Sequence, residues 1–114
     1  MKFLLQNYPG RSIEEFERLS TDERQSIVDE YLALRQSPGF IGGEQLQPVE
    51  TATTVRVENG QTLLTDGPFL DAKEHVGGYF VLEVDDLDAA LEIAARVPAA
   101  RMGGAVEVRP LVER

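Results

Sequence analysis

The apolar run over residues 77–84 constrains the fold of this chain more than any other feature. It reads GGYFVLEV, with few polar positions, and it ends at the acidic residues Asp85, Asp86 and Asp88. A nearly continuous apolar run of this length is typical of a central strand with both faces buried. Each face of that strand therefore needs a cover, from the chain itself or from a second molecule.

The first third of the chain predicts one strand and one main helix. Residues 1–8 form a short apolar run that Pro9 and Gly10 end, which predicts a buried first strand. Two capping-box patterns follow, Ser12 with Glu15 and Ser20 with Glu23, and the second predicts a helix over residues 21–36. The apolar stripe of that helix comprises Ile27, Tyr31 and Leu34, widened by Val28 and Leu32.

Strands and a second helix are predicted for the rest of the chain. Residues 40–47 alternate weakly, and the pair Asn59-Gly60 separates two β-rich runs, residues 53–58 and 61–65. This pair predicts a hairpin, because both of its turn positions need positive φ. The acidic residues after the central strand predict the start of a helix over residues 87–97, which Pro98 closes. Its predicted packing face is Leu87, Leu91 and Ala94, and residues 106–112 predict a last strand with Val106 and Val108 on one face and Glu107 and Arg109 on the other.

The order of these elements predicts the fold class. Strand, helix, strand with hairpin, strand, helix, strand is an α+β arrangement, a βαββαβ unit in which two helices cover one face of an antiparallel sheet. The chain has 114 residues, which predicts one domain over residues 1–114. No helix is left for the other sheet face, so we expect that face to be buried against an identical subunit in a homodimer.

Charge and composition exclude several partners. Twenty acidic residues against 11 basic ones give a net charge of -9, which disfavours nucleic acid and anionic membranes as partners. The chain has no cysteine, which excludes disulfides and cysteine-based metal sites. It also has no run of roughly 20 apolar residues that could cross a bilayer. We therefore expect a cytoplasmic protein.

A family resemblance rests on one polar segment and several shorter blocks. Residues 65–69, reading TDGPF, are followed by Lys73-Glu74 and by Gly77-Gly78-Tyr79. Further blocks are Gly43-Glu44 with Leu46 and Pro48, then residues 52–56, then Glu83-Val84 with Asp86-Leu87-Asp88, and finally Gly104 with residues 106–110. In their order and spacing, from about residue 40 to residue 110, these blocks resemble the YCII-related proteins that carry a DGPF signature.

This resemblance implies a fold more than a reaction. It implies a ferredoxin-like unit that pairs as a dimeric α/β barrel. The wider fold group includes isomerases, monooxygenases, haem enzymes and non-catalytic members, so the fold does not select a chemistry. Members with the DGPF signature are often found beside extracytoplasmic-function sigma factors, and a His-Asp pair has been proposed for the broader set. His75 does not match the position of that histidine, and Leu70-Asp71-Ala72 departs from the usual signature.

The DGPF segment has a structural and a functional interpretation. Asp66-Gly67-Pro68 suits a tight turn, because Asp can bond the backbone, Gly tolerates unusual φ and Pro suits a first helical turn. In the functional interpretation the turn presents Asp66, and a helical turn over residues 69–75 sets Asp71 and His75 four residues apart. A carboxylate on one imidazole nitrogen would leave the other free for proton transfer.

The other candidates in and near this segment are charged or aromatic. Lys73, Glu74, Phe69 and Glu44 are candidate ligand-binding residues, with surface or core roles as the alternative. We interpret Phe69, Tyr79 and Phe80 as core, and Glu44 with Arg56 as a structural ion pair. Asp66, Asp71, Glu74 and His75 form the one set that could hold Mg or Mn, and we predict neither a metal nor an organic cofactor.

Two functional hypotheses follow. The first is a small-molecule enzyme of the isomerase, lyase or hydrolase kind, with His75 and either Asp66 or Asp71 as acid-base groups. The second is a non-catalytic module that binds a small ligand or a regulatory partner such as a sigma factor. A buried pocket that contains His75 would favour the first, and a solvated loop would favour the second.

Overall fold

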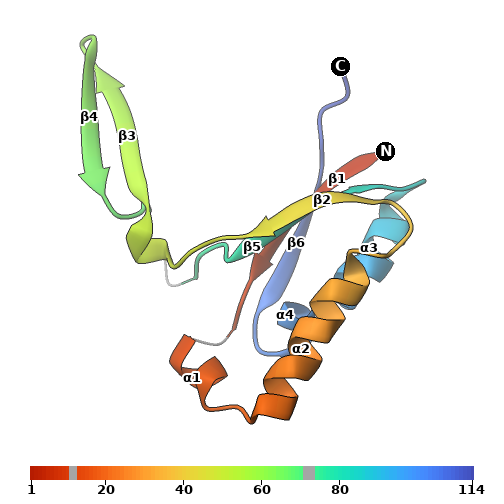
Figure 1. The fold of residues 1–114 in the computed structure, drawn as a ribbon. Helices are drawn as coiled ribbons and strands as arrows, with labels where there is room; N and C mark the ends of the chain where they lie inside the picture. Colours follow the sequence, from red (N-terminus) through yellow and green to blue (C-terminus); the bar gives the residue numbers. More distant parts are fainter. Residues whose placement is uncertain (11–12, 71–73) are drawn as a thin grey trace.

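The computed structural model describes residues 1–10, 13–70 and 74–114 and holds one four-stranded antiparallel sheet (Figure 1). Its strand order is β2-β5-β1-β6, and the strands are β1 Lys2–Tyr8, β2 Phe40–Gln45, β5 Gly78–Glu83 and β6 Ala105–Pro110. The apolar run becomes β5, which lies between β2 and β1 as a central strand should. The order matches a ferredoxin-like unit, so the predicted α+β class is confirmed.

Four α-helices and one short 3-10 helix connect the strands. The α-helices are α1 Ile13–Glu17, α2 Thr21–Leu34, α3 Leu87–Ala95 and α4 Pro98–Arg101, and the 3-10 helix is η1 Val49–Thr51. None of the described helices is long and apolar enough to cross a membrane. The predicted long helices end about two residues early, and Pro98 begins α4 instead of only closing α3, because Pro is well suited to the first helical position.

The helix starts follow the predicted capping chemistry. The backbone N–H of Glu23 donates to Ser20 Oγ at 3.1 Å, and the backbone N–H of Ser20 donates to Glu23 Oε1 at 3.3 Å. Asp86 caps α3, its Oδ1 accepting from the backbone N–H of Ala89 at 2.9 Å. The first capping-box prediction includes Ser12, which lies outside the described residues.

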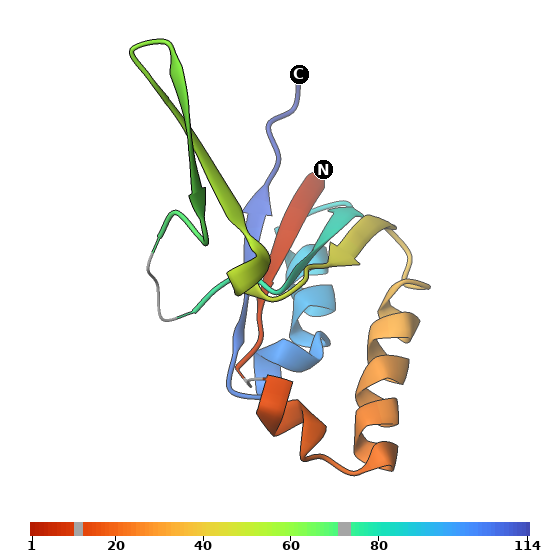
Figure 2. The ribbon, with the colours of Figure 1, turned by 60° about the vertical axis from the view of Figure 1, so that its left-hand side comes forward.

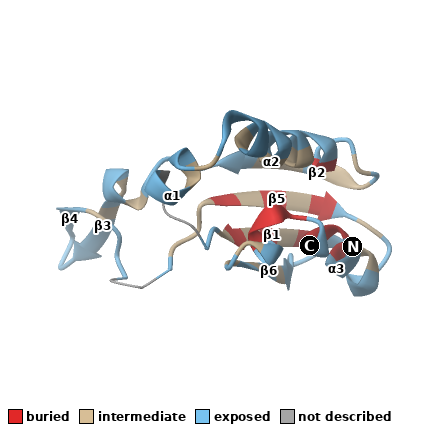
Figure 3. Cartoon of the chain, turned by 90° about the horizontal axis from the view of Figure 1, so that it is seen from below, coloured by how far each residue is buried: buried red, intermediate tan, exposed pale blue. Residues whose placement is uncertain are grey.

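The core lies between the sheet and the helices. Alternate residues of β1 and β5, among them Phe3, Leu5, Phe80 and Leu82, are buried on this side. They pack with residues of the helices and the segments next to them: Leu34, Ala90, Ile93, Ala94, Val97 and Ala99. Figure 3 shows the buried residues concentrated in β1 and β5. Val106 and Val108 pack on the same core, as their predicted shared face requires.

Two predicted helix faces are partly wrong. On α2, Leu34 is buried and Tyr31 packs on the core, but Val28 and Leu32 are exposed. On α3, the buried residues are Ala90, Ile93 and Ala94, whereas Leu87 and Leu91 are exposed. Small alanines let α3 approach the sheet closely, so the larger leucines lie toward solvent. Apolar residues alone therefore did not identify the packing faces.

No helix of the described residues lies over the opposite face of the sheet. Residues paired in register share a face, and Leu4 pairs with Val81 and Arg109, while Gln6 pairs with Tyr79 and Glu107. These side chains alternate with the buried ones on β1 and β5, so they point away from the helices. We call this surface the open sheet face. It combines half-buried apolar side chains in the centre with charged ones on the edge strand β6.

The predicted hairpin forms a second, separate sheet. Strands β3 Thr53–Glu58 and β4 Gln61–Asp66 pair around Asn59 at φ 51° and Gly60 at φ 75°, the positive values that this turn needs. Figures 1 and 2 show the hairpin standing away from the body of the molecule. The radius of gyration is 16.2 Å, against about 13 Å for a compact chain of this length.

Candidate functional site

The DGPF segment begins at the base of the hairpin, where Gly67 has a structural role. Its φ of +102° is one that side chains rarely adopt. The backbone N–H of Gly67 donates to the carbonyl of Ala52 at 2.7 Å, and Thr54 Oγ1 donates to the carbonyl of Gly67 at 2.7 Å. These bonds extend the hairpin by one step beyond Asp66. The unusual φ predicted for Gly67 is confirmed, and the bonds of Gly67 tie the start of the DGPF segment to β3 and to Ala52, while Pro68 begins no helix among the described residues.

Asp66 and Phe69 are both presented to solvent. Asp66 is the last residue of β4, opposite Thr53, and its side chain is exposed. Phe69 is 69% exposed, so its interpretation as a core residue is wrong. The guanidinium carbon of Arg56 lies 5.7 Å from the centre of the Phe69 ring, a cation–π contact between β3 and the loop. A cation and an aromatic ring therefore meet near the hairpin base, whereas Asp66 points to the other face of the hairpin.

The predicted helical turn over residues 69–75 is not found in the described part of that segment. Phe69, Leu70 and Glu74 lie in bends, and His75 has no regular structure. Asp71 and Lys73 lie outside the described residues. Glu74 is exposed, whereas His75 is half-buried, and among the described residues no polar group bonds its ring. The alternative interpretation of His75, as a solvated surface residue, is therefore only partly correct.

The segment after His75 is held between two strands. The backbone N–H of Gly77 donates to the carbonyl of Asn7 at 2.8 Å, and its carbonyl accepts from the backbone N–H of Leu46 at 2.9 Å. A Cβ on Gly77 would lie 2.9 Å from the ring of Pro9, so the chain passes close to this ring. Backbone bonds at Gly77, two residues further on, thus restrain the position of His75.

Asn7 is a polar residue near this site that the sequence patterns did not single out. It is 6% exposed, and its Oδ1 has no hydrogen-bond partner in the part of the chain that the structure describes. A buried acceptor without a partner is uncommon in folded proteins and calls for an explanation. The alternation of β1 contained the signal, because Asn7 shares a face with the buried Phe3 and Leu5 at spacings of four and two residues.

Glu44 lies on the open sheet face and not in an ion pair with Arg56. It pairs in register with Tyr79, and its side chain is exposed. Arg56 instead forms an ion pair with Glu58 at 3.1 Å, two residues along the same strand. The predicted Glu44–Arg56 pair is therefore wrong, because the hairpin stands away from β2. Phe80 is core as predicted, and Tyr79 lies half-buried on the open sheet face.

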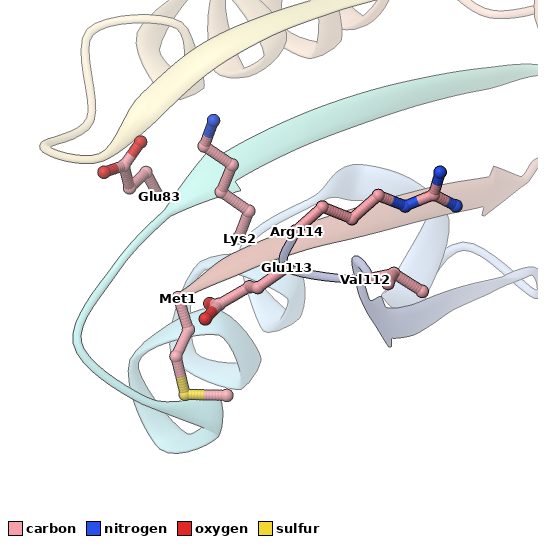
Figure 4. Close-up of a pocket in the computed structure, with 6 residues that line it drawn as sticks. All are labelled: Met1, Lys2, Glu83, Val112, Glu113 and Arg114. Atoms are coloured by element: carbon pink, nitrogen blue, oxygen red, sulfur yellow. The ribbon is translucent and has the colours of Figure 1, made fainter.

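A shallow hollow of about 250 Å³ lies elsewhere, beside the first residues of β1 (Figure 4). It is lined by Met1, Lys2, Glu83, Val112, Glu113 and Arg114. His75 lies near the opposite end of β1, because its neighbour Gly77 bonds Asn7. The hollow therefore contains none of the predicted site residues.

These features define a ferredoxin-like α+β domain with an inserted hairpin and a polar segment at the hairpin base. The pattern of the YCII-related domain matches residues 1–114. The chain belongs to the YCII-related family, as the DGPF resemblance predicted.

Two similar proteins differ in how much is known of them. An uncharacterized protein, R00369 of Rhizobium meliloti (strain 1021), is 38% identical over 68 residues, 59% of this chain and 55% of the relative. The match thus spans about half the length of that curated relative. The chain also aligns with the 5-chloro-2-hydroxyhydroquinone dehydrochlorinase TftG of Burkholderia phenoliruptrix AC1100, solved with 2,5-dihydroxybenzoquinone. That alignment has a TM-score of 0.48 and 15% identity and covers 100% of this chain and 96% of the other.

Proposed function

We propose that this YCII-related protein is a small-molecule enzyme that moves protons with His75. The observation that carries this proposal is the setting of the single histidine. It is half-buried, its ring has no polar partner among the described residues, and backbone bonds at Gly77 restrain it. A restrained imidazole with a free nitrogen can both accept and donate a proton near neutral pH.

In this proposal, residues of the hairpin base and of the loop before His75 supply the remaining parts of the site. Asp66 and Glu74 are exposed carboxylates. Asp66 precedes the loop between β4 and β5, and Glu74 comes directly before His75 in the sequence. Arg56 offers a cation for an anionic substrate. Phe69, whose ring contacts Arg56, offers an aromatic surface for an apolar substrate. Asp66 and His75 make no direct contact in the described structure, so a substrate between them would complete the constellation.

Hydrogen exchange into small molecules tests this activity without a known substrate. The purified protein would be incubated in D₂O with a panel of enolisable keto acids, and NMR would follow loss of the C–H signals next to each carbonyl. An enzyme that abstracts a proton next to a carbonyl exchanges it for deuterium even when its full reaction goes further. His75→Gln should slow exchange by about 10²- to 10⁴-fold while the fold persists. Equal exchange by the two proteins would remove His75 from the mechanism.

A ligand-binding module without chemistry is the second candidate. Its support is the absence of a direct carboxylate–imidazole contact among the described residues. Because the chain has one histidine, a single Hε1 resonance reports on the site during ligand titration. Saturable shifts of that resonance with no deuterium exchange in the bound compound would favour binding over catalysis.

The functional unit in this proposal is a homodimer that buries the open sheet face. Leu4, Tyr79 and Val81 are half-buried there, with no helix over them. Two copies can bury this face by packing the same surface of each against the other, as two-fold symmetry requires. Light scattering after size exclusion measures the mass, and a single-chain mass at all micromolar concentrations would refute the dimer.

A further inference from the structure

The hairpin β3–β4 has two chemically different faces. Val55 pairs with Leu64 and Val57 with Thr62, so the side chains of Val55, Val57 and Leu64 share one face. Their exposed fractions are 58%, 66% and 68%. We call this surface the apolar arm face. The opposite face carries Thr54, Arg56, Glu58, Gln61, Leu63 and Thr65.

No other part of the described chain covers the apolar arm face. The hairpin stands away from the sheet and helices, and its residues are exposed except for Thr54 (Figure 3). A two-stranded hairpin alone in water is marginally stable at best. The backbone bonds of Gly67 hold only its base. An apolar surface on such an arm therefore requires cover from outside the chain.

We propose that the apolar arm face packs on a second copy of this chain, at the rim of the dimer. This inference rests on the homodimer proposed above. Each copy has one apolar arm face and one open sheet face, so two copies present four such surfaces. In a dimer with two-fold symmetry these four surfaces can cover one another, which favours a second copy as the occupant. A closed dimer of this kind leaves no arm free to recruit a third chain.

The area of the open sheet face supports the same occupant. Four strands spaced about 4.8 Å apart, each rising about 20 Å over its length, give a footprint of about 400 Å². Specific, stable interfaces bury about 600–1,000 Å² from each partner. The apolar arm face adds about 200 Å² by the same spacings. Together the two areas reach about 600 Å² per copy, the lower end of that range.

Two adjacent leucines provide a matched test. Leu64 lies on the apolar arm face and Leu63 on the opposite face of the same strand. Leu64→Lys should raise the dimer dissociation constant about tenfold or more, whereas Leu63→Lys should change it less than threefold. Sedimentation equilibrium measures both constants. The hairpin lies outside the core, so circular dichroism should show that both variants fold.

A second measurement locates the arm directly. Because the chain has no cysteine, Leu64→Cys and Leu63→Cys each introduce a single thiol. The reaction of Cys at position 64 with a thiol reagent should slow as protein concentration rises through the dissociation constant. At position 63 the rate should stay constant.

The outcomes separate the two proposals. A wild-type protein that stays monomeric would refute the homodimer, and the arm inference with it. A stable dimer with equal effects of the two lysine substitutions, or with position 64 equally reactive at all concentrations, would overturn the arm inference alone. Protection of position 64 in a monomer would also overturn it, because the cover would then come from the same chain.

Discussion

Replacement of Asn7 by valine should stabilise the protein. The side chain is 6% exposed, and its Oδ1 has no hydrogen-bond partner among the described residues, so folding removes it from water without compensation from them. An unpaired buried acceptor costs about 1–3 kcal/mol. Valine is apolar, suits a strand and leaves unchanged the backbone carbonyl that accepts from Gly77.

The size of the effect follows from these terms. Repacking around the new methyl groups offsets part of the gain, which leaves about 1 kcal/mol in the free energy of unfolding. For a domain of this size, that corresponds to a rise of about 4 °C in Tm. Thermal unfolding followed by circular dichroism, at one protein concentration so that association does not contribute, measures the change.

The control is Asn7→Asp, which keeps the shape and places a charge at the same position. Burial raises the pKa of a carboxyl there, since it disfavours the charged form. The loss of stability should therefore be several kcal/mol at pH 7 and smaller at acidic pH, where the folded state keeps the proton. If valine lowered Tm as much as aspartate does, Oδ1 would have a native partner and the reasoning would fail.

Three further predictions concern stability. Gly104→Ala should lower the free energy of unfolding by about 3 kcal/mol, because its Cβ would lie 2.0 Å from the Tyr8 carbonyl oxygen. Gly42→Ala is the control, since its Cβ would meet nothing within 4 Å, and urea unfolding measures both variants. Gly60→Ala, at φ +75°, should cost about 1 kcal/mol and speed amide exchange in the hairpin alone. Burial raises the pKa of Tyr31, although a backbone hydrogen bond at Ala99 and the charge of Arg101 lower it. The contribution of Tyr31 to the free energy of unfolding is therefore full below about pH 10 and is lost as pH rises through the pKa of the folded state. Tyr31→Phe should reduce that alkaline loss in pH-dependent unfolding; an unchanged profile would contradict it.

The candidate site was only partly predictable from the sequence. The DGPF segment, the positive φ of Gly67 and the candidate residue His75 follow from residue types and their neighbours. The exposure of Phe69, the Arg56–Glu58 ion pair and the unpaired Oδ1 of Asn7 do not. The exposure of Phe69 and the burial of Asn7 depend on which elements pack together. Arg56 pairs with a residue of its own strand because the hairpin stands away from β2 and Glu44.

The sequence by itself determined the order of elements, the helix start at Ser20 and the turn at Asn59-Gly60. These features depend on bonds and dihedral angles within a few residues, so local chemistry is sufficient. Only the tertiary structure decided which apolar side chains are covered: Ala90 and Ile93 face the sheet, while Leu91 and Leu64 face solvent. Whether a side chain is buried depends on the other elements that folding brings next to it. When both faces of a helix or strand carry apolar residues, the local sequence does not show which face will be covered.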